Sequence, residues 1–371
     1  MSLSGQWIAR YSGSNSGVIV IDLDDLGDHF EGTAIAWDDN PQHPNAFVRI
    51  RTFSKSGNQS LKNVPIIPID DMGNSVSPDV LRRLQEADMI MPDTVDIYID
   101  LSNDILSVRW VPSIGTSGNA IARPSKNRQN MPSDLKSTKI KGWDEFKTKA
   151  NSLETKRYIY RGKSSNKWRL RTSFHRTDRA DLQRYSNFDI QDLNRTFSAL
   201  TPHAFNLSDG LHHAALINLA QHHGYPTPML DWTWSPYVAA FFAYRQIGRY
   251  EKSREKVRIF KFDCSAWNNL PRADKLFAFQ PNLTMLTTLA FGNTRQIPQQ
   301  AMSMHSNVDD IEAHIADVEN KSSIKYIEAF DLPVKDRNHI MNELTLMGIT
   351  AGSMFPGLDG ACESLKERNF N

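Results

Sequence analysis

Short stretches in which apolar and polar residues alternate dominate the first third of the chain. Residues 94–101, Thr-Val-Asp-Ile-Tyr-Ile-Asp-Leu, carry an apolar side chain at every second position, which is the period of a half-buried β-strand. Five further segments share this β-branched and aromatic content: 7–11, 18–23, 30–37, 46–53 and 105–111. Turn-forming residues separate the segments. Residues 1–115 therefore predict a mostly antiparallel β domain, a small barrel or sandwich, which we interpret as a recognition or regulatory domain.

Two segments within this domain depart from the alternation. Residues 64–69 contain Pro65 and Pro68, and because proline cannot donate to a β-ladder we expect an edge segment there. Residues 77–85 begin with Ser77 and Pro78, the N-cap and first-turn residues that predict a short helix.

The remaining two thirds of the chain have a different pattern. Residues 116–140 are rich in Ser, Gly, Asn, Pro and Lys, and this composition predicts a linker. Apolar residues then recur with helical spacing, beginning near Trp143 and continuing over 190–208, 214–222 and 237–244, with strand-like runs at 158–162 and 325–330. Residues 141–371 are therefore expected to form a second, α+β domain.

Composition limits the class of protein. The chain has 371 residues, 40% of them hydrophobic and 23% charged, which predicts a globular protein of two or three domains. It contains no run of about 18 apolar residues, and Met1 is not followed by a basic and then an apolar segment. We therefore expect a cytoplasmic protein that does not enter a membrane. Cys264 and Cys362 lie far apart; we expect both to serve packing, and no metal site.

Charge is distributed unevenly along the chain. Residues 1–110 hold sixteen Asp and Glu against eight Lys and Arg, whereas residues 123–179 hold seventeen Lys and Arg against five acids. The basic segment is compatible with a phosphate-bearing ligand or a nucleic acid. It is equally compatible with a solvated linker and helix face, and the sequence leaves both interpretations open.

The tripeptide Tyr160-Arg161-Gly162 is the first motif with recognisable chemistry. It places an arginine at the end of a short apolar strand, next to a glycine. A guanidinium held in this way can grip phosphate or ribose, and glycine lets a ligand approach the backbone. A surface arginine in an ordinary strand-end turn would have the same sequence.

Residues 216–244 concentrate further polar and aromatic groups between two predicted helices. His222 and His223 end the first helix, either as dipole-compatible caps or as acid/base groups. Ser235 and Pro236 predict the N-cap and first turn of the second helix, while Asp231 and Thr233 are also capping types. Trp232 and Trp234 offer a flat stacking surface near these polar groups.

Together these motifs resemble the FRG domain, which is named for its Phe/Tyr-Arg-Gly motif. The resemblance rests on Tyr160-Arg161-Gly162 and on Gln221-His222-His223-Gly224-Tyr225-Pro226-Thr227-Pro228-Met229-Leu230-Asp231-Trp232-Thr233-Trp234-Ser235-Pro236. Residues 293–303 are similar to the family's Arg- and Gln-containing strand, and residues 344–360 to its closing helix and turn. The similarity covers about 143–365. Family members often carry a Gly-aromatic pair where this chain has Ala301-Met302, which predicts a modified pocket.

The order of these parts also resembles an ADP-ribosyltransferase, and this likeness implies roles for individual residues. It implies catalytic roles for Arg161, Ser235, Gln300 and Glu328. It implies NAD-binding roles for Tyr160, Gly162, His222, His223, Asp231, Trp232, Thr233, Arg295 and Gln299. A carboxylate should stabilise the cation-like ribose of such a reaction. Gln299 and Gln300 occupy the expected place but carry no charge, so Glu328 is the fallback.

Three functional hypotheses follow. The first is an NAD-dependent ADP-ribosyltransferase or NAD hydrolase, a toxin-like bacterial or phage-defence effector whose β domain senses a regulatory partner and whose acceptor is a protein or nucleic acid. The second is a non-catalytic module that binds a nucleotide or nucleic acid. The third is a scaffold for protein contacts. Nicotinamide release from NAD, tested with Arg161→Ala, would separate the first from the others.

Overall fold

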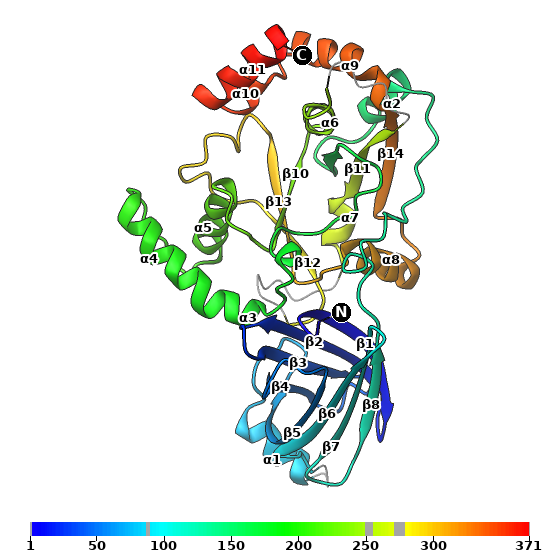
Figure 1. The fold of residues 1–371 in the computed structure, drawn as a ribbon, viewed down its shortest axis with the longest axis vertical. Coiled ribbons are helices and arrows are strands. Elements are labelled where there is room, and N and C mark those ends of the chain that lie inside the picture. The colour runs from blue at the N-terminus through cyan, green and yellow to red at the C-terminus, as the bar shows by residue number, and fades with distance from the viewer. Residues whose placement is uncertain (1, 87–89, 249–254, 271–278, 371) are drawn as a thin grey trace.

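The protein consists of an N-terminal β-barrel and a C-terminal α+β region that contacts one end of the barrel (Figure 1). The computed structural model describes residues 2–86, 90–248, 255–270 and 279–370. No helix in those ranges is both long enough and apolar enough to cross a bilayer.

The N-terminal domain is a closed barrel of eight antiparallel strands in sequence order, not a sandwich. Its strands are β1 (Gly5–Gly13), β2 (Gly17–Asp25), β3 (Phe30–Asp38), β4 (Asn45–Arg51), β5 (Asn58–Ile69), β6 (Thr94–Ser102), β7 (Ile105–Pro112) and β8 (Gly118–Ala122). The hairpins expected from the alternating segments are confirmed. β8 closes the barrel against β1, with Tyr11 opposite Ala120, so the barrel extends beyond residue 115 into the segment expected to be a linker.

β5 explains how a strand with two prolines fits into a closed barrel. It pairs with β6 up to Pro65 and with β4 from Ile66 onward, and the register shifts between Leu61 and Val64. Pro65 therefore pairs only with β6, and Pro68 pairs only with β4. Because each proline has a neighbouring strand on one side only, its missing N–H does not cost the barrel a hydrogen bond on the other side. The prolines thus mark short unpaired sides within β5, whereas the strand as a whole lies inside the closed barrel and is not an edge strand. Helix α1 (Pro78–Glu86) follows, as its capping residues predicted.

The C-terminal region is built on a six-stranded sheet with the order β12-β13-β10-β9-β11-β14. Its strands are β9 (Tyr158–Lys163), β10 (Met229–Thr233), β11 (Lys256–Asp263), β12 (Leu283–Leu286), β13 (Ala301–Ser306) and β14 (Ile327–Pro333). β11 lies inside this sheet and is buried along almost its whole length, because helices cover both faces. Its sequence mixes apolar and charged residues, and the buried Arg258 and Lys261 are paired with Asp331 and Glu328 of the neighbouring strand β14.

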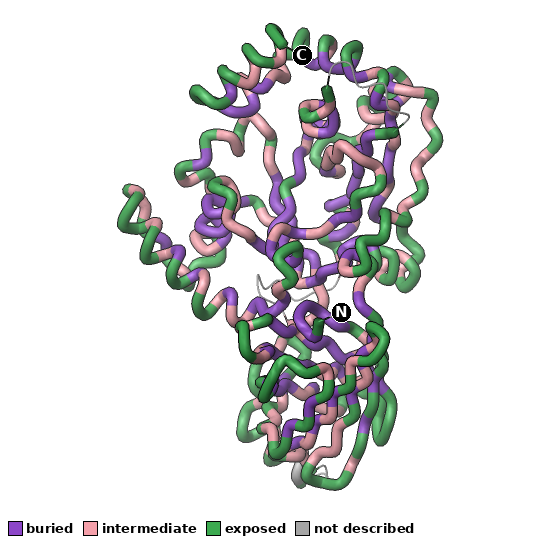
Figure 2. Tube along the Cα trace, in the orientation of Figure 1, coloured by how far each residue is buried: buried purple, intermediate pink, exposed green. Residues whose placement is uncertain are grey.

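Helices cover the two faces of this sheet. The helices of the C-terminal region are α2 (Trp143–Asn151), α3 (Leu182–Arg184), α4 (Ile190–Leu200), α5 (Gly210–His222), α6 (Pro236–Tyr244), α7 (Cys264–Asn268), α8 (Ile311–Ser322), α9 (Arg337–Leu346), α10 (Ala351–Met354) and α11 (Leu358–Phe370). One core cluster joins α2, α6, α9 and α10 to the sheet, and another joins α7 and α8 to it. Figure 2 shows the buried segments gathered at the sheet, with α4 and α11 largely exposed. Cys264 is buried as expected, but Cys362 is exposed on α11, so its packing role was wrongly predicted.

The barrel and the C-terminal region meet through buried polar contacts. Asp24, at the end of β2, accepts hydrogen bonds from Arg179 Nε at 2.8 Å and from the backbone N–H groups of Ala180 and Asp181 at 2.7 and 3.1 Å. Gln6 donates to the carbonyl oxygen of Asn307 at 2.7 Å and accepts from the N–H of Asp309 at 2.9 Å. Asp24 is 1% exposed, so these bonds are shielded from water and fix the two parts against each other.

Candidate functional site

The candidate site is a cavity of about 360 Å³ at the point where two central strands separate. β9 and β10 share only one paired position, Thr233 with Tyr160, whereas β9 pairs with β11 over six positions. The space between the diverging strands is lined from both of them and from α5, α6 and the segment before β13. A concave site of this size at a break in a sheet suits a small ligand.

Arg161 and Asp231 lie on either side of this opening. Arg161 Nη1 donates a hydrogen bond to the carbonyl oxygen of Asp231, and its Nε is buried with no partner in the described part of the chain. Burial lowers the pKa of Arg161 to about 10, with Asp231 opposing and Arg176 adding to the shift. The carbonyl oxygen of Asp231 therefore holds the guanidinium at the cavity wall, and Nε has no partner among the described residues.

Lys163 adds a second cation to the same cavity. It lines the cavity two residues after Arg161, and we find no ion-pair partner for it among the described residues. Burial, together with the guanidinium groups of Arg161 and Arg176, lowers the pKa of Lys163 well below its usual range. Clustered cations that lack internal carboxylate partners favour an anionic ligand, which would relieve their repulsion.

The opposite wall combines a third cation with an aromatic ring. Arg295 lies 5.0 Å from the ring centre of Phe355, and no described carboxylate pairs with it. Arg245 also lies over this ring, at 4.2 Å, but two hydrogen bonds to Glu363 engage its guanidinium. Arg295 is therefore the cation of this wall that can bind a ligand. Gln299 lines the cavity too, with its amide donating to the carbonyl oxygen of Met354 at 2.9 Å.

Asp231 is the only carboxylate among the described residues that line the cavity. Its side chain is exposed and accepts a hydrogen bond from Gln221 Nε2, while Gln221 accepts one from Thr227 Oγ1. This chain of bonds orients the carboxylate from the end of α5. His222 lines the same side, and burial, Arg295 and His223 lower its pKa, so a neutral imidazole is favoured there.

Gly162 has a packing role. A Cβ added at this position would lie 1.9 Å from the carbonyl oxygen of Ala239 in α6. The glycine therefore lets the helix backbone contact β9, and the helix occupies the space that a ligand was expected to approach. Tyr160, on the same strand, is 4% exposed and packs in the core beneath α6.

The remaining predicted residues divide into two groups. Trp232 and Thr233 line the cavity, although Thr233 already donates to the carbonyl oxygen of Gln299 at 2.7 Å. Ser235, Gln300 and Glu328 do not line it. Ser235 caps α6 by accepting from the N–H of Val238 at 3.2 Å.

Glu328 and Gln300 lie next to other hollows. Glu328 accepts from Lys261 Nζ at 2.6 Å beside a small hollow near α2. Gln300 precedes β13 and lines a separate hollow together with Trp234. His223 is the exposed C-cap of α5 and is absent from the cavity lining.

Sequence reasoning missed Lys163. Residues two apart on a strand point to the same face. The strand predicted at 158–162 therefore gave a signal that could have found Lys163, since extending that strand by one residue places Lys163 on the same face as Arg161.

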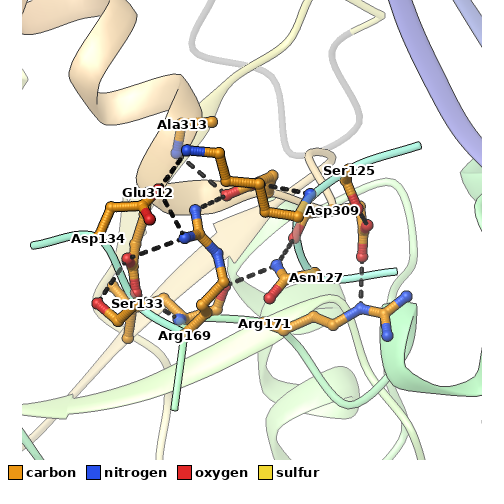
Figure 3. A network of polar contacts seen from close by, with 12 residues as sticks. Ser125, Asn127, Ser133, Asp134, Arg169, Arg171, Asp309, Glu312 and Ala313 are labelled. Atoms are coloured by element: carbon orange, nitrogen blue, oxygen red, sulfur yellow. Dashed lines mark hydrogen bonds and ion pairs between the residues drawn. The ribbon is translucent and has the colours of Figure 1, made fainter. Parts of the chain in front are cut away.

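Eight of the seventeen basic side chains in segment 123–179 pair with described carboxylates of the protein itself. Figure 3 shows Arg169 and Arg171 reaching the acidic start of α8. Arg169 donates to Asp310 at 2.7 Å and to Asp134 at 3.0 Å, and Arg171 donates to Asp309 at 2.5 Å. The arginines thus neutralise buried acids, and they fix a segment that composition predicts to be a linker.

The same network holds the chain that follows the barrel. Asn127 donates to the carbonyl oxygens of Asp309 at 2.6 Å and Leu170 at 3.2 Å, and Ser133 donates to Glu312 at 2.8 Å (Figure 3). Residues 123–134 are thereby bound to α8. This arrangement supports neither a free linker nor a broad polyanion surface there.

One other group of side chains has the spacing of metal ligands. Ligand atoms of Asp144, His339 and Glu343 lie within 4.8 Å of one another. Lys147 already donates to Asp144 at 3.0 Å and to Glu343 at 2.7 Å, and Trp143 also donates to Glu343. The ammonium group thus bridges the two carboxylates and supplies the positive charge that they need.

Comparison with known proteins identifies one domain. Residues 156–252 match the family model described as FRG domain. The match contains β9, α5, β10 and α6, and hence Arg161, Lys163 and Asp231; Arg295 and Phe355 come from outside it. No curated protein matches the chain, and no solved structure does.

Proposed function

We propose that the cavity between β9 and β10 binds NAD or a closely similar nucleotide and cleaves its N-glycosidic bond, transferring ADP-ribose to water or to an acceptor. The observation that carries this proposal is one carboxylate, Asp231, facing a cavity whose cations Arg161, Lys163 and Arg295 lack internal carboxylate partners. The cations of such a site would bind a diphosphate, and the carboxylate would stabilise a ribose cation.

The three cations suit the diphosphate of the nucleotide. Arg161 has a buried donor without a partner, Nε, and a phosphate oxygen would satisfy it. Lys163, whose pKa is lowered by burial and by neighbouring guanidiniums, would regain its charge beside an anion. Arg295 approaches from the other wall, over Phe355, so the phosphates would be gripped from two sides.

Asp231 suits the reacting sugar. When the bond between ribose C1′ and the nicotinamide nitrogen breaks, its electron pair leaves with nicotinamide and positive charge develops on the ribose. A carboxylate beside the ring stabilises that charge more in the transition state than in the ground state. Water or an acceptor hydroxyl then bonds to C1′, and its proton passes to Asp231 and on to solvent. Gln221 holds the carboxylate in place.

Asp231 takes the role for which Glu328 was the fallback. Glu328 is paired with Lys261 at 2.6 Å away from the cavity, whereas Asp231 lines it. The NAD-binding role that the resemblance implies for Trp232 also belongs to this proposal, because the residue lines the cavity and its indole N–H is buried without a described partner.

The barrel is the sensing part in this proposal. Its Asp24 is bound to residues 179–181, which follow closely on Arg176, a guanidinium that acts electrostatically on Arg161 and Lys163. An event in the barrel therefore has a short path to the cavity, along the chain from residues 179–181 to Arg176 and by electrostatic interaction from Arg176 to the two cations. A cytoplasmic location and a toxin-like role in bacterial or phage defence extend the proposal on the strength of the family resemblance.

The proposal is tested by incubating the protein with NAD and measuring nicotinamide release by chromatography. We expect release by the wild type and a loss of about 10²-fold or more in Asp231→Asn, because the substitution removes the charge and keeps the shape. Arg161→Lys should lose turnover as well, since lysine lacks the planar fork. Asp317→Asn and Arg195→Lys change exposed residues of α8 and α4 and serve as matched controls.

Two results would contradict the proposal. Equal turnover by Asp231→Asn and the wild type would remove the carboxylate from the mechanism. No turnover, with retained binding of ADP-ribose, would instead identify the cavity as a non-catalytic nucleotide site.

A further inference from the structure

The interior of the barrel contains a second cavity, of about 300 Å³. It is lined by residues of seven strands, β1 to β7, among them Ile21, Val48, Ile97 and Val108. Eight-stranded barrels are just wide enough either to be filled by their own side chains or to hold one small ligand. This barrel therefore encloses enough space for a ligand, and the question is why its side chains leave that space open.

Strand β3 explains the open space. Every second residue from Phe30 to Asp38 reads Phe-Gly-Ala-Ala-Asp, so the inward face of the strand changes from large to small along its length. Ala36 lies directly opposite Ala46 of β4, and both line the cavity. At the other end Trp7 and Phe30, 1% and 2% exposed, fill the barrel. The end facing the C-terminal region is solid and the far end is hollow.

The hollow end opens to solvent away from the C-terminal region. The turns that border it contain Ser14, Pro44 and Ser117, whereas the contacts with the C-terminal region involve Gln6 and Asp24 at the opposite ends of β1 and β2. In Figure 1 the C-terminal region covers only one end of the barrel. A ligand could therefore enter the barrel without passing the nucleotide cavity.

One polar cluster interrupts the apolar lining, at the mouth. The side chain of Asp38 is 5% exposed and accepts from Tyr11 Oη at 3.3 Å, from Asn15 Nδ2 and from the N–H of Asn40 at 2.8 Å. His43 Nδ1 lies 3.4 Å from the same carboxylate. The hydroxyl group of Tyr11 donates its hydrogen bond to Asp38, so the Tyr11 oxygen can still accept a hydrogen bond from a ligand. A negative, accepting end on an apolar cavity selects against anions.

We propose that the barrel binds one small amphiphile, whose apolar body is about the size of two fused rings and whose single amine group points to Tyr11 and Asp38. An apolar cavity of about 150 Å³ accepts one benzene ring, and this cavity has about twice that volume. The inference stands apart from the proposed NAD chemistry, because it uses no residue of the nucleotide cavity.

The test compares two probes that share one ring system, 1-naphthylmethylamine and 1-naphthoic acid, by isothermal titration calorimetry on the full chain. We expect the amine to bind and the acid to bind at least about tenfold more weakly, a difference of about 1.4 kcal/mol. Ala36→Leu should weaken amine binding by about tenfold or more, since the added carbons occupy the cavity. Ala361→Leu makes the same change on the exposed surface of α11 and should leave binding unchanged.

Ala46→Leu fills the same space from β4 and replaces Ala36→Leu if that variant does not fold. In the wild type, a nuclear Overhauser effect between the naphthyl protons and the Ala36 methyl group would locate the bound amine without any substitution. Failure of the amine to bind, equal binding of amine and acid, or unchanged binding in a folded cavity-filled variant would each overturn the proposal.

Discussion

The two cavities of this protein differ in every property that determines what they can hold. The barrel cavity is walled by aliphatic side chains and ends at one buried carboxylate, Asp38. The cavity in the C-terminal region has cationic groups on both walls and one exposed carboxylate, Asp231. The first selects for apolar surface and against anions, and the second selects for anions.

The difference arises from how each sheet leaves space. In the barrel all strands stay paired, and the hollow is made by small side chains such as Ala36 and Ala46. In the C-terminal sheet the hollow is made by the backbone, because β9 and β10 pair at a single position and then diverge. Diverging strands leave main-chain groups such as the carbonyl oxygen of Asp231 facing the cavity, which is why that site can be polar.

The largest effect we predict is on stability, and it tests whether the barrel and the C-terminal region unfold together or separately. Asp24→Ala should lower the free energy of unfolding by about 3–5 kcal/mol, since it leaves Nε of Arg179 and two buried backbone N–H groups without their acceptor. Differential scanning calorimetry should then show separate transitions where the wild type shows one. Asp25→Ala, which removes an exposed carboxylate paired with Lys55, should cost less than about 1 kcal/mol. A single unchanged transition in Asp24→Ala would show that other contacts hold the regions together.

The second prediction contrasts the response of the regions to acid. His175 is 1% exposed, and burial lowers its pKa to about 4, so the folded protein keeps it neutral while the unfolded chain protonates it below about 6.5. Stability should therefore fall by about 3 kcal/mol between pH 6.5 and pH 4. Urea unfolding across this range should show a flatter profile for His175→Gln, and no change of slope for the exposed His339→Gln.

Asp22 in the barrel should act in the opposite direction. Burial, opposed by the hydrogen bond from Gln6 and assisted by nearby carboxylates, raises the pKa of Asp22 well above its usual range. The folded state then holds a proton that the unfolded chain has already lost, so this contribution decreases as pH rises above about 4. Asp22→Asn should steepen the loss of stability on acidification. If His175→Gln and Asp22→Asn changed the pH dependence of stability in the same direction, the opposite pKa shifts given for His175 and Asp22 would be contradicted.

The smallest predicted effect tests whether the cavities act independently. Lys163→Gln should weaken ADP-ribose binding by about tenfold, or about 1.4 kcal/mol, and leave binding of 1-naphthylmethylamine within about twofold. Ala36→Leu should show the reverse pattern, and Lys321→Gln, on the exposed face of α8, should change neither. Calorimetric titration measures both ligands. Weakening of both by one substitution would instead demonstrate coupling through the interface.

Much of the barrel could be predicted because its strands carry their own signal. Alternation with period two identified the hairpins, but Gly118–Ala122 is short and lies in a Ser- and Gly-rich stretch, so the closing strand was hidden. The composition of residues 116–140 wrongly predicted a linker for a different reason. Asn127 and Arg169 are fixed by Asp309 and Asp310, and contacts between such distant positions have no local pattern.

The site was predictable only in part. Arg161 and Asp231 could be singled out from their motifs, but the carboxylate role of Asp231 depends on where β9 and β10 diverge, which no single segment encodes. Ser235 illustrates the opposite case. Its position before Pro236 predicted a helix cap, the structure confirms the cap, and its hydroxyl accepts the hydrogen bond of that cap.

The contacts of Gln6 also have a consequence for synthesis of the chain. The barrel can close as soon as β8 has left the ribosome, because all its pairings lie before Ala122. Gln6 must wait for Asn307. The 185 residues from Ala122 to Asn307 take roughly ten to forty seconds to synthesise at about 5–20 residues per second. We expect the carboxylates at this end of the barrel to be hydrated and charged during that interval, and their repulsion to disfavour association of nascent domains through the surface that the C-terminal region later covers.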